Sequence, residues 1–256
     1  MKSVAIATVL LAAGAIAAPN TAARRAKNAA RIGRRSNLRQ PAINPPVNGS
    51  KNVEFSENWA GAVLSDSGFT SVTGTIIVPT PESDGQSAAA SAWVGIDGDT
   101  CATAILQTGL DFTVSAGGEV SYDAWYEWFP DFAFDFDNFD ISSGDEVKMT
   151  VTASSKSSGT ATIENLTTGQ TVSHSFSGET NELCEFDAEW IVEDFEEGSS
   201  LVPFADFDSV TFTDASAVKN GKTVGVTGAA ILDIEQEEVL TDCSIEGTNS
   251  VTCSYI

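Results

Sequence analysis

The chain has 256 residues and a formal net charge of −23 at pH 7. It contains a single histidine, His174, which excludes a histidine-rich metal site and is the one histidine that a Ser-His-Asp catalytic triad could use. The charge is unevenly divided, because nine of the 13 basic residues precede Glu54 and all 36 acidic residues lie from Glu54 onward. The part from Glu54 to Ile256 therefore carries a formal charge of −32.

The first 18 residues contain one lysine, then an apolar run, then small residues. This pattern predicts a secretory signal peptide over residues 1–18, since the apolar run is too short and wrongly flanked for a membrane span. No later stretch is long and apolar enough to cross a bilayer. We therefore predict a secreted, extracellular protein with no membrane partner.

Residues 19–53 form a basic segment without Asp or Glu. Nucleic acid is a poor candidate partner because a secreted chain meets little of it. Arg34-Arg35 and Lys51 offer processing points, and the prolines between 41 and 46 mark a loose linker. We predict a propeptide that lies on the acidic domain and inhibits it until acid protonates the carboxylates. The alternative is a disordered leader whose charge only aids transport.

Residues 54–256 are enough for one sizeable core, and strand patterns dominate them. Val147–Ala153, for example, alternates apolar and polar side chains almost without exception. No convincing amphipathic helix exceeds a turn or two. The pattern predicts an all-β sandwich of antiparallel strands with jelly-roll topology. Further strands are expected near Val72–Val78, Thr160–Leu166, Thr171–Phe176, Val210–Phe212 and Ala229–Ile234.

Four cysteines, an even number in a secreted chain, favour two disulfide bonds. Cys243 and Cys253 flank a Gly-Thr-Asn-Ser turn, which favours a hairpin pair and leaves Cys101 to bond Cys184. Two other pairings are formally possible.

Asn165-Leu166-Thr167 is a glycosylation sequon, as is Asn48-Gly49-Ser50 in the basic segment. The run Asp131–Asp140 mixes acids with aromatic residues but lacks the glycine and terminal glutamate of an EF-hand. We expect this run to be a loop that packs its Phe rings, with its acids in solvent. His174 is expected to be an ordinary strand or surface residue.

Four strand-like segments combine an apolar face with a polar or aromatic one, because successive side chains point to opposite sides. The segments are Ala92–Asp97, Thr103–Thr108, Tyr122–Trp128 and Ala188–Phe195. In the last of these, Trp190 and Val192 share the apolar face, opposite Glu189. If the polar faces share one sheet, they form a groove lined by Trp93, Asp97, Gln107, Asp123, Trp125, Glu127 and Glu189.

Each of these residues also has a simpler explanation. The tryptophans fit a core, Asp97 fits the turn that follows it, and Glu127 fits a solvated strand position. Gln107 is the exception, because a long amide in an otherwise apolar strand needs hydrogen-bond partners or exposure.

Five separated segments resemble the fungal glutamic peptidases, the eqolisins of peptidase family G1. They are Asn58–Gly61, Ser91–Asp99, Ile105–Gly109, Tyr122–Trp128 and Ala188–Glu193. The resemblance runs from about Asn58 to the C-terminus. It implies a concanavalin-like sandwich of two curved antiparallel sheets. It also implies a pepstatin-insensitive acid endopeptidase, made as a preproprotein, that acts on polypeptides without metal or cofactor. We expect a monomer.

The family's catalytic pair, a Gln and a Glu, falls on Gln107 and Glu189. The resemblance implies that Glu189 takes a proton from water and returns it to the leaving amine. Gln107 would hold that water and donate to the oxyanion. Supporting positions carried over by the same segments are Trp93, Asp97, Asp111, Asp123, Trp125 and Glu127.

Three other functions stay open from the residues alone. A pepsin-type aspartic peptidase needs two carboxylates sharing a site, and Asp66-Ser67-Gly68 is a single copy of its motif. A jelly-roll glycoside hydrolase would use Glu127 and Glu189 as its carboxylate pair. A lectin-like protein would bind without turnover.

The crowded carboxylates lead to a prediction about stability. Neighbouring carboxylates raise one another's pKa values, so the folded domain would hold protons that the unfolded chain releases. Its stability is therefore expected to fall as the pH rises toward neutrality.

Overall fold

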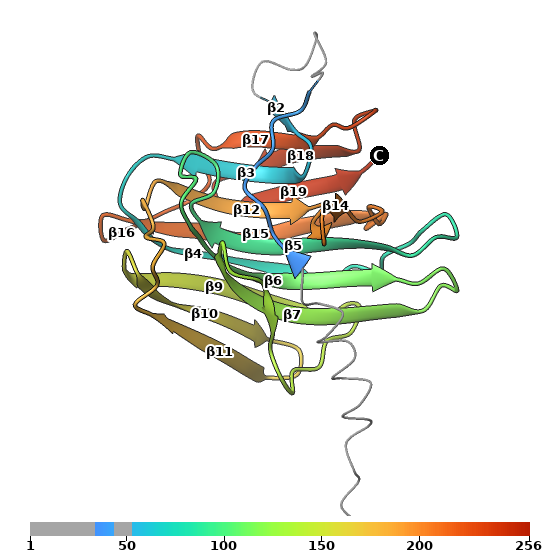
Figure 1. Cartoon of the computed structure of the whole chain (residues 1–256), viewed down its shortest axis with the longest axis horizontal. Helices are drawn as coiled ribbons and strands as arrows, with labels where there is room; N and C mark the ends of the chain where they lie inside the picture. The colour runs from blue at the N-terminus through green and yellow to red at the C-terminus, as the bar shows by residue number, and fades with distance from the viewer. Residues whose placement is uncertain (1–33, 44–52) are drawn as a thin grey trace, which may run out of the picture.

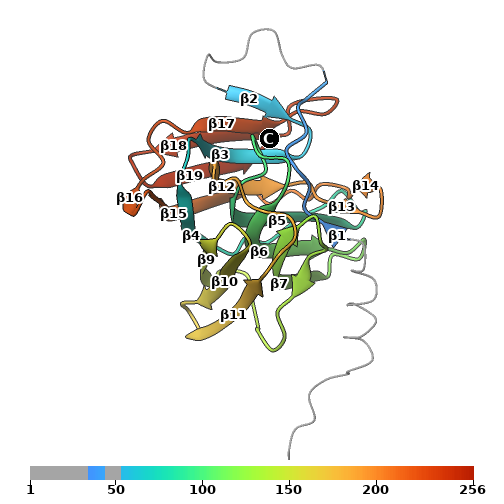
Figure 2. The same cartoon turned by 60° about the vertical axis from the view of Figure 1, so that its left-hand side comes forward.

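The computed structural model describes residues 34–43 and 53–256, and their regular structure consists of β-strands (Figures 1 and 2). Within these residues there is no helix, and hence no helix that could span a membrane. The prediction of an all-β domain is confirmed. The predicted signal peptide, residues 1–18, and the sequon at Asn48 lie outside the described residues.

Two eight-stranded sheets stack on each other, and the larger part of the apolar core lies between them (Figure 1). We call them the site sheet and the back sheet. In spatial order, the site sheet contains β2 (Val53–Ser56), β17 (Ala230–Ile234), β3 (Trp59–Ser65), β12 (Asp187–Glu193), β5 (Ala88–Ile96), β6 (Ile105–Val114), β7 (Val120–Phe129) and β8 (Phe134–Asp135).

The back sheet contains most of the strands predicted from alternation. In order, these are β11 (Gln170–Ser177), β10 (Ser158–Asn165), β9 (Glu146–Ser155), β4 (Phe69–Ile77), β15 (Ser209–Lys219), β19 (Ser250–Tyr255) and β18 (Thr241–Glu246), with β16 (Lys222–Val224) beside β15. A small third sheet joins β1 (Arg34–Arg35), β13 (Glu196–Glu197) and β14 (Ser200–Leu201). The named strands pair antiparallel with one departure, the parallel pairing of β2 with β17.

The alternation of β12 anchors the site sheet to the back sheet. Trp190 and Val192 are fully buried in the core between the sheets, as predicted. The indole Nε1 of Trp190 donates to the backbone oxygen of Thr73 on β4 at 2.8 Å. Ile191 belongs to a second apolar cluster on the other face of the site sheet. The two faces of β12 therefore have separate partners, and its side chains are held to one orientation.

Both predicted disulfide bonds are present. Cys101–Cys184 ties the loop after β5 to the loop before β12, and Cys243–Cys253 joins β18 to β19. The first bond therefore connects two segments of the site sheet that are 83 residues apart in the chain.

The loop between Asp131 and Asp140 packs only half of its rings. Phe136 and Phe139 lie against the core as predicted, whereas Phe132 and Phe134 are exposed. His174 is a strand residue on β11 whose ring stacks on Tyr126, with ring centroids 4.0 Å apart.

The surroundings of Asn165, the candidate glycosylation site, disfavour a glycan. Asn165 is only 1% exposed, and its Nδ2 donates to Asp145 Oδ2 at 2.8 Å and to the backbone oxygen of Asp140 at 3.2 Å. Its Oδ1 accepts from the backbone N–H groups of Thr167 and Thr168. An N-linked glycan needs this same nitrogen and open space around it. Asn165 is therefore a structural residue that shapes the turn after β10.

We expect Asn165→Ala to lower the free energy of unfolding by about 2 kcal/mol, because it leaves buried hydrogen-bonding groups without partners. Denaturant unfolding measures the change, and mass spectrometry should find Asn165 unmodified in the folded protein. The neighbouring Leu166→Ala is the control, since Leu166 is exposed and its loss should change stability by less than about 0.5 kcal/mol. A glycan on Asn165, or equal stability of the two variants, would contradict the structural role.

Candidate active site

The outer face of the site sheet, away from the main core, carries the candidate catalytic residues. The register of β12, β5, β6 and β7 pairs Glu189 with Gly95, Gly95 with Gln107, and Gln107 with Glu127. Residues directly opposite one another on neighbouring strands point to the same face. Glu189, Gly95, Gln107 and Glu127 therefore form one row, which we call the dyad row.

Gly95 lets the two predicted catalytic side chains approach each other. It separates Gln107 from Glu189 by one strand, so their Cα atoms are about 10 Å apart. A Cβ atom at position 95 would lie 2.8 Å from Oε1 of Glu189. The carboxylate therefore occupies the space above the glycine, between its own strand and β6. Any larger residue at position 95 would displace it.

The predicted pair has an unusual hydrogen-bonding state. Gln107 and Glu189 are completely buried. Within the described part of the chain, no protein group hydrogen-bonds to either carboxylate oxygen of Glu189 or to the amide oxygen or nitrogen of Gln107. Buried polar groups in folded proteins nearly always have partners, and leaving them without costs free energy. Four such atoms beside one glycine indicate a site shaped for a ligand or a water molecule.

The acidity of Glu189 follows from its surroundings. Burial raises the pKa of Glu189 well above its usual value, and the charges of Asp187, Asp97 and Asp99 raise it further. A carboxyl group of this kind holds a proton more strongly than an ordinary glutamate, which suits a group that must both accept and return a proton.

A row of tryptophans lies next to the dyad row. Trp93 on β5 and Trp125 on β7 flank Gly109 on β6 and are both fully buried. A Cβ atom at position 109 would lie 2.5 Å from Cβ of Trp93 and 2.8 Å from Cζ2 of Trp125, so the glycine makes room for both. Trp59 packs edge-on against Trp93, with ring centroids 5.0 Å apart. These rings form the predicted aromatic wall.

A third row holds the remaining polar candidates. Asp111 and Asp123 face each other on β6 and β7, and the pairing continues through Ser91 on β5 to Glu193 on β12. This row lies four residues from the dyad row, or about 13 Å along the strands. Glu127, and not Asp123, is therefore the direct neighbour of Gln107.

Asp97 holds the loop beside the predicted pair. Its carboxylate accepts backbone N–H groups from all four residues of 184–187, at distances between 2.7 and 3.2 Å. It thereby fixes the loop that enters β12, next to the Cys101–Cys184 bond. Asp97 and the two sulfur atoms lie close enough to suggest metal ligands, but the sulfurs are bonded to each other, so this cluster is structural. The charge of Asp97 also acts on Glu189, which agrees with a supporting position.

The groove itself is covered, whereas we expected an open face. Residues 36–40 lie over it, and Figure 1 shows the blue segment crossing the strands of the site sheet. The backbone N–H of Ser36 donates to Glu127 Oε2 at 3.3 Å, and that of Asn37 donates to Glu193 Oε1 at 3.1 Å. The Ser36 hydroxyl donates to Glu193 Oε2. The basic segment predicted as a propeptide therefore contacts both the dyad row and the third row.

The same segment is also held by apolar packing and by the first residues of β3. The indole Nε1 of Trp59 donates to the backbone oxygen of Asn37 at 3.1 Å. Leu38 packs against the outer apolar cluster, whose buried members are Trp59, Val63, Trp93, Ile105, Trp125, Ala133, Ile191 and Leu232. The polar face of the site sheet is therefore not open, because residues 36–40 of the same chain occupy the groove.

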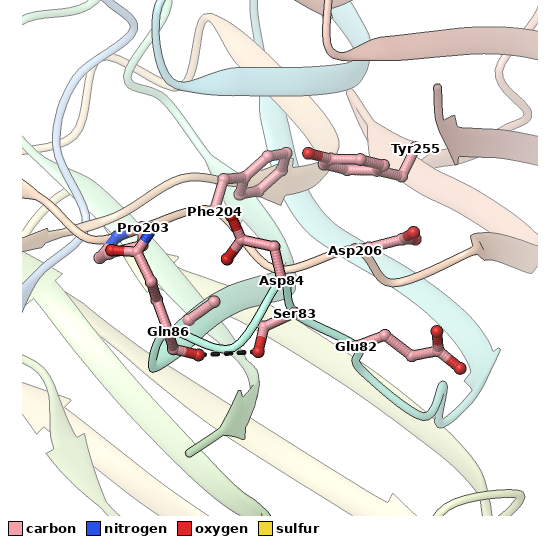
Figure 3. A pocket seen from close by; sticks show the side chains of 9 residues that line it. Glu82, Ser83, Asp84, Gln86, Pro203, Phe204, Asp206 and Tyr255 are labelled. Carbon is pink, nitrogen blue, oxygen red and sulfur yellow. Dashed lines mark hydrogen bonds between the residues drawn. The ribbon is translucent and has the colours of Figure 1, made fainter. Parts of the chain in front are cut away.

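A separate cavity of about 360 Å³ opens beside Phe204 and Tyr255 (Figure 3). Its rim carries three acids, Glu82, Asp84 and Asp206. Neither member of the predicted pair lines it, so it is distinct from the groove on the site sheet.

The protein-family model described as the Peptidase A4 family matches residues 57–255. The chain belongs to the Peptidase A4 family. Aspergillopepsin-2 of Aspergillus niger is 52% identical over 274 residues, covering 96% of each chain. Scytalidopepsin B of Scytalidium lignicola is 50% identical over 216 residues, covering 81% of each.

A solved structure of scytalido-glutamic peptidase with a peptide-based transition state analog matches with a TM-score of 0.72 and 50% identity, covering 78% of this chain and 98% of that one. The resemblance to the eqolisins is thereby confirmed, and this Peptidase A4 member is a glutamic endopeptidase.

Some residues of the Peptidase A4 site were missed by sequence reasoning. Glu193 shares the face of Glu189, two alternations further along the same strand, but it was not among the predicted groove residues. Its role became visible from its bonds to Asn37 N and to Trp93 Nε1, the latter at 2.9 Å. Gly95 was not among the predicted groove residues either, because the need for a glycine there depends on the position of Glu189.

Two further buried carboxyls in this Peptidase A4 domain have raised pKa values. Burial raises the pKa of Asp194 to about 7, with a contribution from the charge of Glu193 and against a hydrogen bond from Gln236. Burial likewise raises the pKa of Asp233 to about 6, against a hydrogen bond from Thr241. Both folded-state pKa values lie above the usual 3.8, so these two groups make their full contribution to the free energy of unfolding at low pH. It is lost as the pH rises through about 6 to 7.

We expect the thermal midpoint of unfolding to fall as the pH rises from about 4 to about 8. Asp194→Asn should make this decline smaller, because the amide oxygen can still accept from Gln236 but no longer ionises. Scanning calorimetry across the pH range measures both slopes, with Glu119→Gln in an exposed loop as the matched control. A midpoint that rises steadily over this range would contradict the prediction.

Proposed function

We propose that this endopeptidase is secreted, acts in acid and uses Gln107 and Glu189 as its catalytic pair. The observation that carries the proposal is the set of four buried atoms on these two side chains that have no protein partner, on either side of Gly95. A relative of the same family has been solved with a peptide-based transition state analog, and this supports a polypeptide as the substrate.

In the proposed mechanism, Glu189 as a carboxylate accepts a proton from a water molecule that attacks the scissile carbonyl carbon. The protonated Glu189 then gives that proton to the nitrogen of the leaving amine as the C–N bond breaks. Gln107 holds the water and donates its amide N–H to the developing oxyanion, which is worth about 3 kcal/mol. A neutral amide remains a donor at low pH, so this arrangement suits an acid peptidase.

The pKa of Glu189 is raised while residues 36–40 cover the groove, and this agrees with a general base that becomes active only when the cover leaves. Burial is the largest cause of the raised value. Removal of residues 36–40 would readmit water and lower the pKa of Glu189 toward its usual range. The carboxylate form needed for attack is then populated in acid, while the covered form keeps the group protonated.

A glycoside hydrolase with Glu127 and Glu189 as its pair is disfavoured by strand spacing. Three strand intervals separate the two residues, or about 14 Å between Cα atoms. Glycosidase carboxyl groups lie about 5 to 9.5 Å apart, so both side chains would have to lean toward each other across Gln107. Gln107, which a glycosidase of this kind would not need, lies between them.

The basic segment 19–53 is proposed as an inhibitory propeptide, and residues 54–256 as the mature domain. The contacts of Ser36 and Asn37 with Glu127 and Glu193 support inhibition, because they occupy the groove. Carboxylates accept stronger hydrogen bonds than protonated carboxyls, so acid would weaken these contacts. The proposed boundary falls inside β2, which pairs with β17. Secretion rests on the pattern of residues 1–18.

We expect Glu189→Gln and Gln107→Ala each to lower kcat/KM for an acid-cleaved peptide by at least about 100-fold. Glu164→Gln on the back sheet is the control and should retain full activity. The assay uses the mature domain with pepstatin present, and a polysaccharide in parallel. Near-normal proteolysis by either dyad variant would refute the assignment. Inhibition by pepstatin would favour an aspartic peptidase, and polysaccharide hydrolysis would favour the glycosidase.

We expect a synthetic peptide of residues 34–43 to inhibit the mature domain more strongly near about pH 6 than near about pH 3. Changing Leu38 to Asp in that peptide should abolish most of the inhibition, because Leu38 packs on the outer apolar cluster. A scrambled peptide of equal charge separates specific docking from general electrostatic attraction. Equal inhibition by all three peptides, or none by the natural one, would disprove the docked propeptide.

A further inference from the structure

The covering segment contains an arginine that is held at a defined place beside the groove. The guanidinium of Arg39 donates from Nη1 to Asp99 Oδ1 at 2.8 Å and from Nη2 to Glu54 Oε2 at 2.6 Å. The side chains of Arg39 and Asp99 are each 14% exposed, whereas that of Glu54 is 55% exposed. Asp99 is therefore the protected partner. The backbone N–H of Arg39 also approaches the oxygen of Gly98 at 3.3 Å.

The backbone around Arg39 is bound in the manner of a ligand strand. Asn58 Nδ2 donates to the oxygen of Leu38 at 3.2 Å, and Asn58 Oδ1 accepts from the N–H of Gln40 at 2.9 Å. A single side-chain amide thus pairs with the residues on both sides of Arg39. Such contacts recognise a backbone whatever its sequence, so selectivity must come from the side chains of residues 38 and 39.

Those two side chains enter different surroundings. Leu38 packs on the outer apolar cluster that includes the tryptophan wall. Arg39 points to Asp99 in the loop that follows β5, four residues beyond Gly95 of the dyad row. The charge of Asp99 also acts on Glu189. The cation therefore binds at the end of the groove nearest the predicted general base.

We propose that Asp99 is a specificity-determining residue that selects a lysine or arginine in the bound polypeptide, directly after an apolar residue held on the outer apolar cluster. This inference rests on the proposed function, because it takes the covering segment as an example of how a substrate binds. Asp99, Asn58 and Trp59 all belong to residues 54–256, so they stay in place when the covering segment leaves.

Two features of the domain favour a cationic side chain at this point. Residues 54–256 have a formal charge of −32, which attracts basic polypeptide segments over long range. A cation bound to Asp99 also offsets one of the three charges that raise the pKa of Glu189. A basic substrate would therefore favour the carboxylate form of Glu189 and shift the pH profile of kcat/KM toward lower pH.

The test compares two peptides that differ at one side chain. Both carry an apolar–X pair, with X either arginine or citrulline, which has nearly the same shape but no charge. We expect the mature domain to prefer the arginine peptide in kcat/KM by about fivefold, as for a partly protected ion pair. The preference should shrink in high salt.

Asp99→Asn should bring the arginine-to-citrulline ratio close to one, while Glu164→Gln on the back sheet keeps it. The ratio is measured on one enzyme sample, so a partial loss of folded protein cancels out. A ratio near one in the unaltered domain, or an unchanged ratio in Asp99→Asn, overturns the subsite. Failure to cleave any peptide in acid overturns the proposed function itself.

Discussion

The site depends on one constraint, which is that successive side chains of β12 pack into two different apolar clusters on opposite faces of the site sheet. Trp190 reaches across the core to the backbone of Thr73, while Ile191 packs on the opposite face. A shift of one residue would place the indole outside and Glu189 in the core, so the packing of Trp190 sets the register. Because β5 and β6 continue that register, Glu189 is aligned with Gly95 and Gln107. The proposed catalytic pair, whose members are distant in the chain, is thus positioned by ordinary core packing.

The free energy released by this core also supports groups that are unfavourable by themselves. Gln107 and Glu189 lie buried without protein hydrogen bonds, and Asp97 is a buried carboxylate in the loop next to Glu189. Asp97 is compensated by four backbone N–H groups and by the nearby disulfide bond. Among the described residues, the proposed catalytic pair has no such compensation, as expected of groups whose partner is a reacting molecule.

Much of the fold could be predicted because a two-residue period in the sequence maps directly onto the faces of a strand. This gave the orientation of Trp190, the strands of the back sheet and the face shared by Gln107 and Glu189. The sheet order that joins β12, β5, β6 and β7 cannot be derived from alternation, and the family resemblance implied only that Gln107 and Glu189 act together. The sequon at Asn165 misled because a tripeptide carries no information about burial. The charge of the basic segment predicted that it lies on the domain, but not that residues 36–40 are the ones over the groove, because this depends on their contacts with strands far along the chain.

The distribution of charge connects these features. Burial raises the pKa values of Asp194 and Asp233, so their protonation in acid favours the folded state. The acids at the groove instead accept hydrogen bonds from the covering segment, as Glu193 does from Asn37. Protonation weakens these contacts, because a neutral carboxyl is a poorer acceptor. A single fall in pH therefore acts in opposite directions on the two sets of carboxyls, stabilising the domain while loosening the segment that covers its groove.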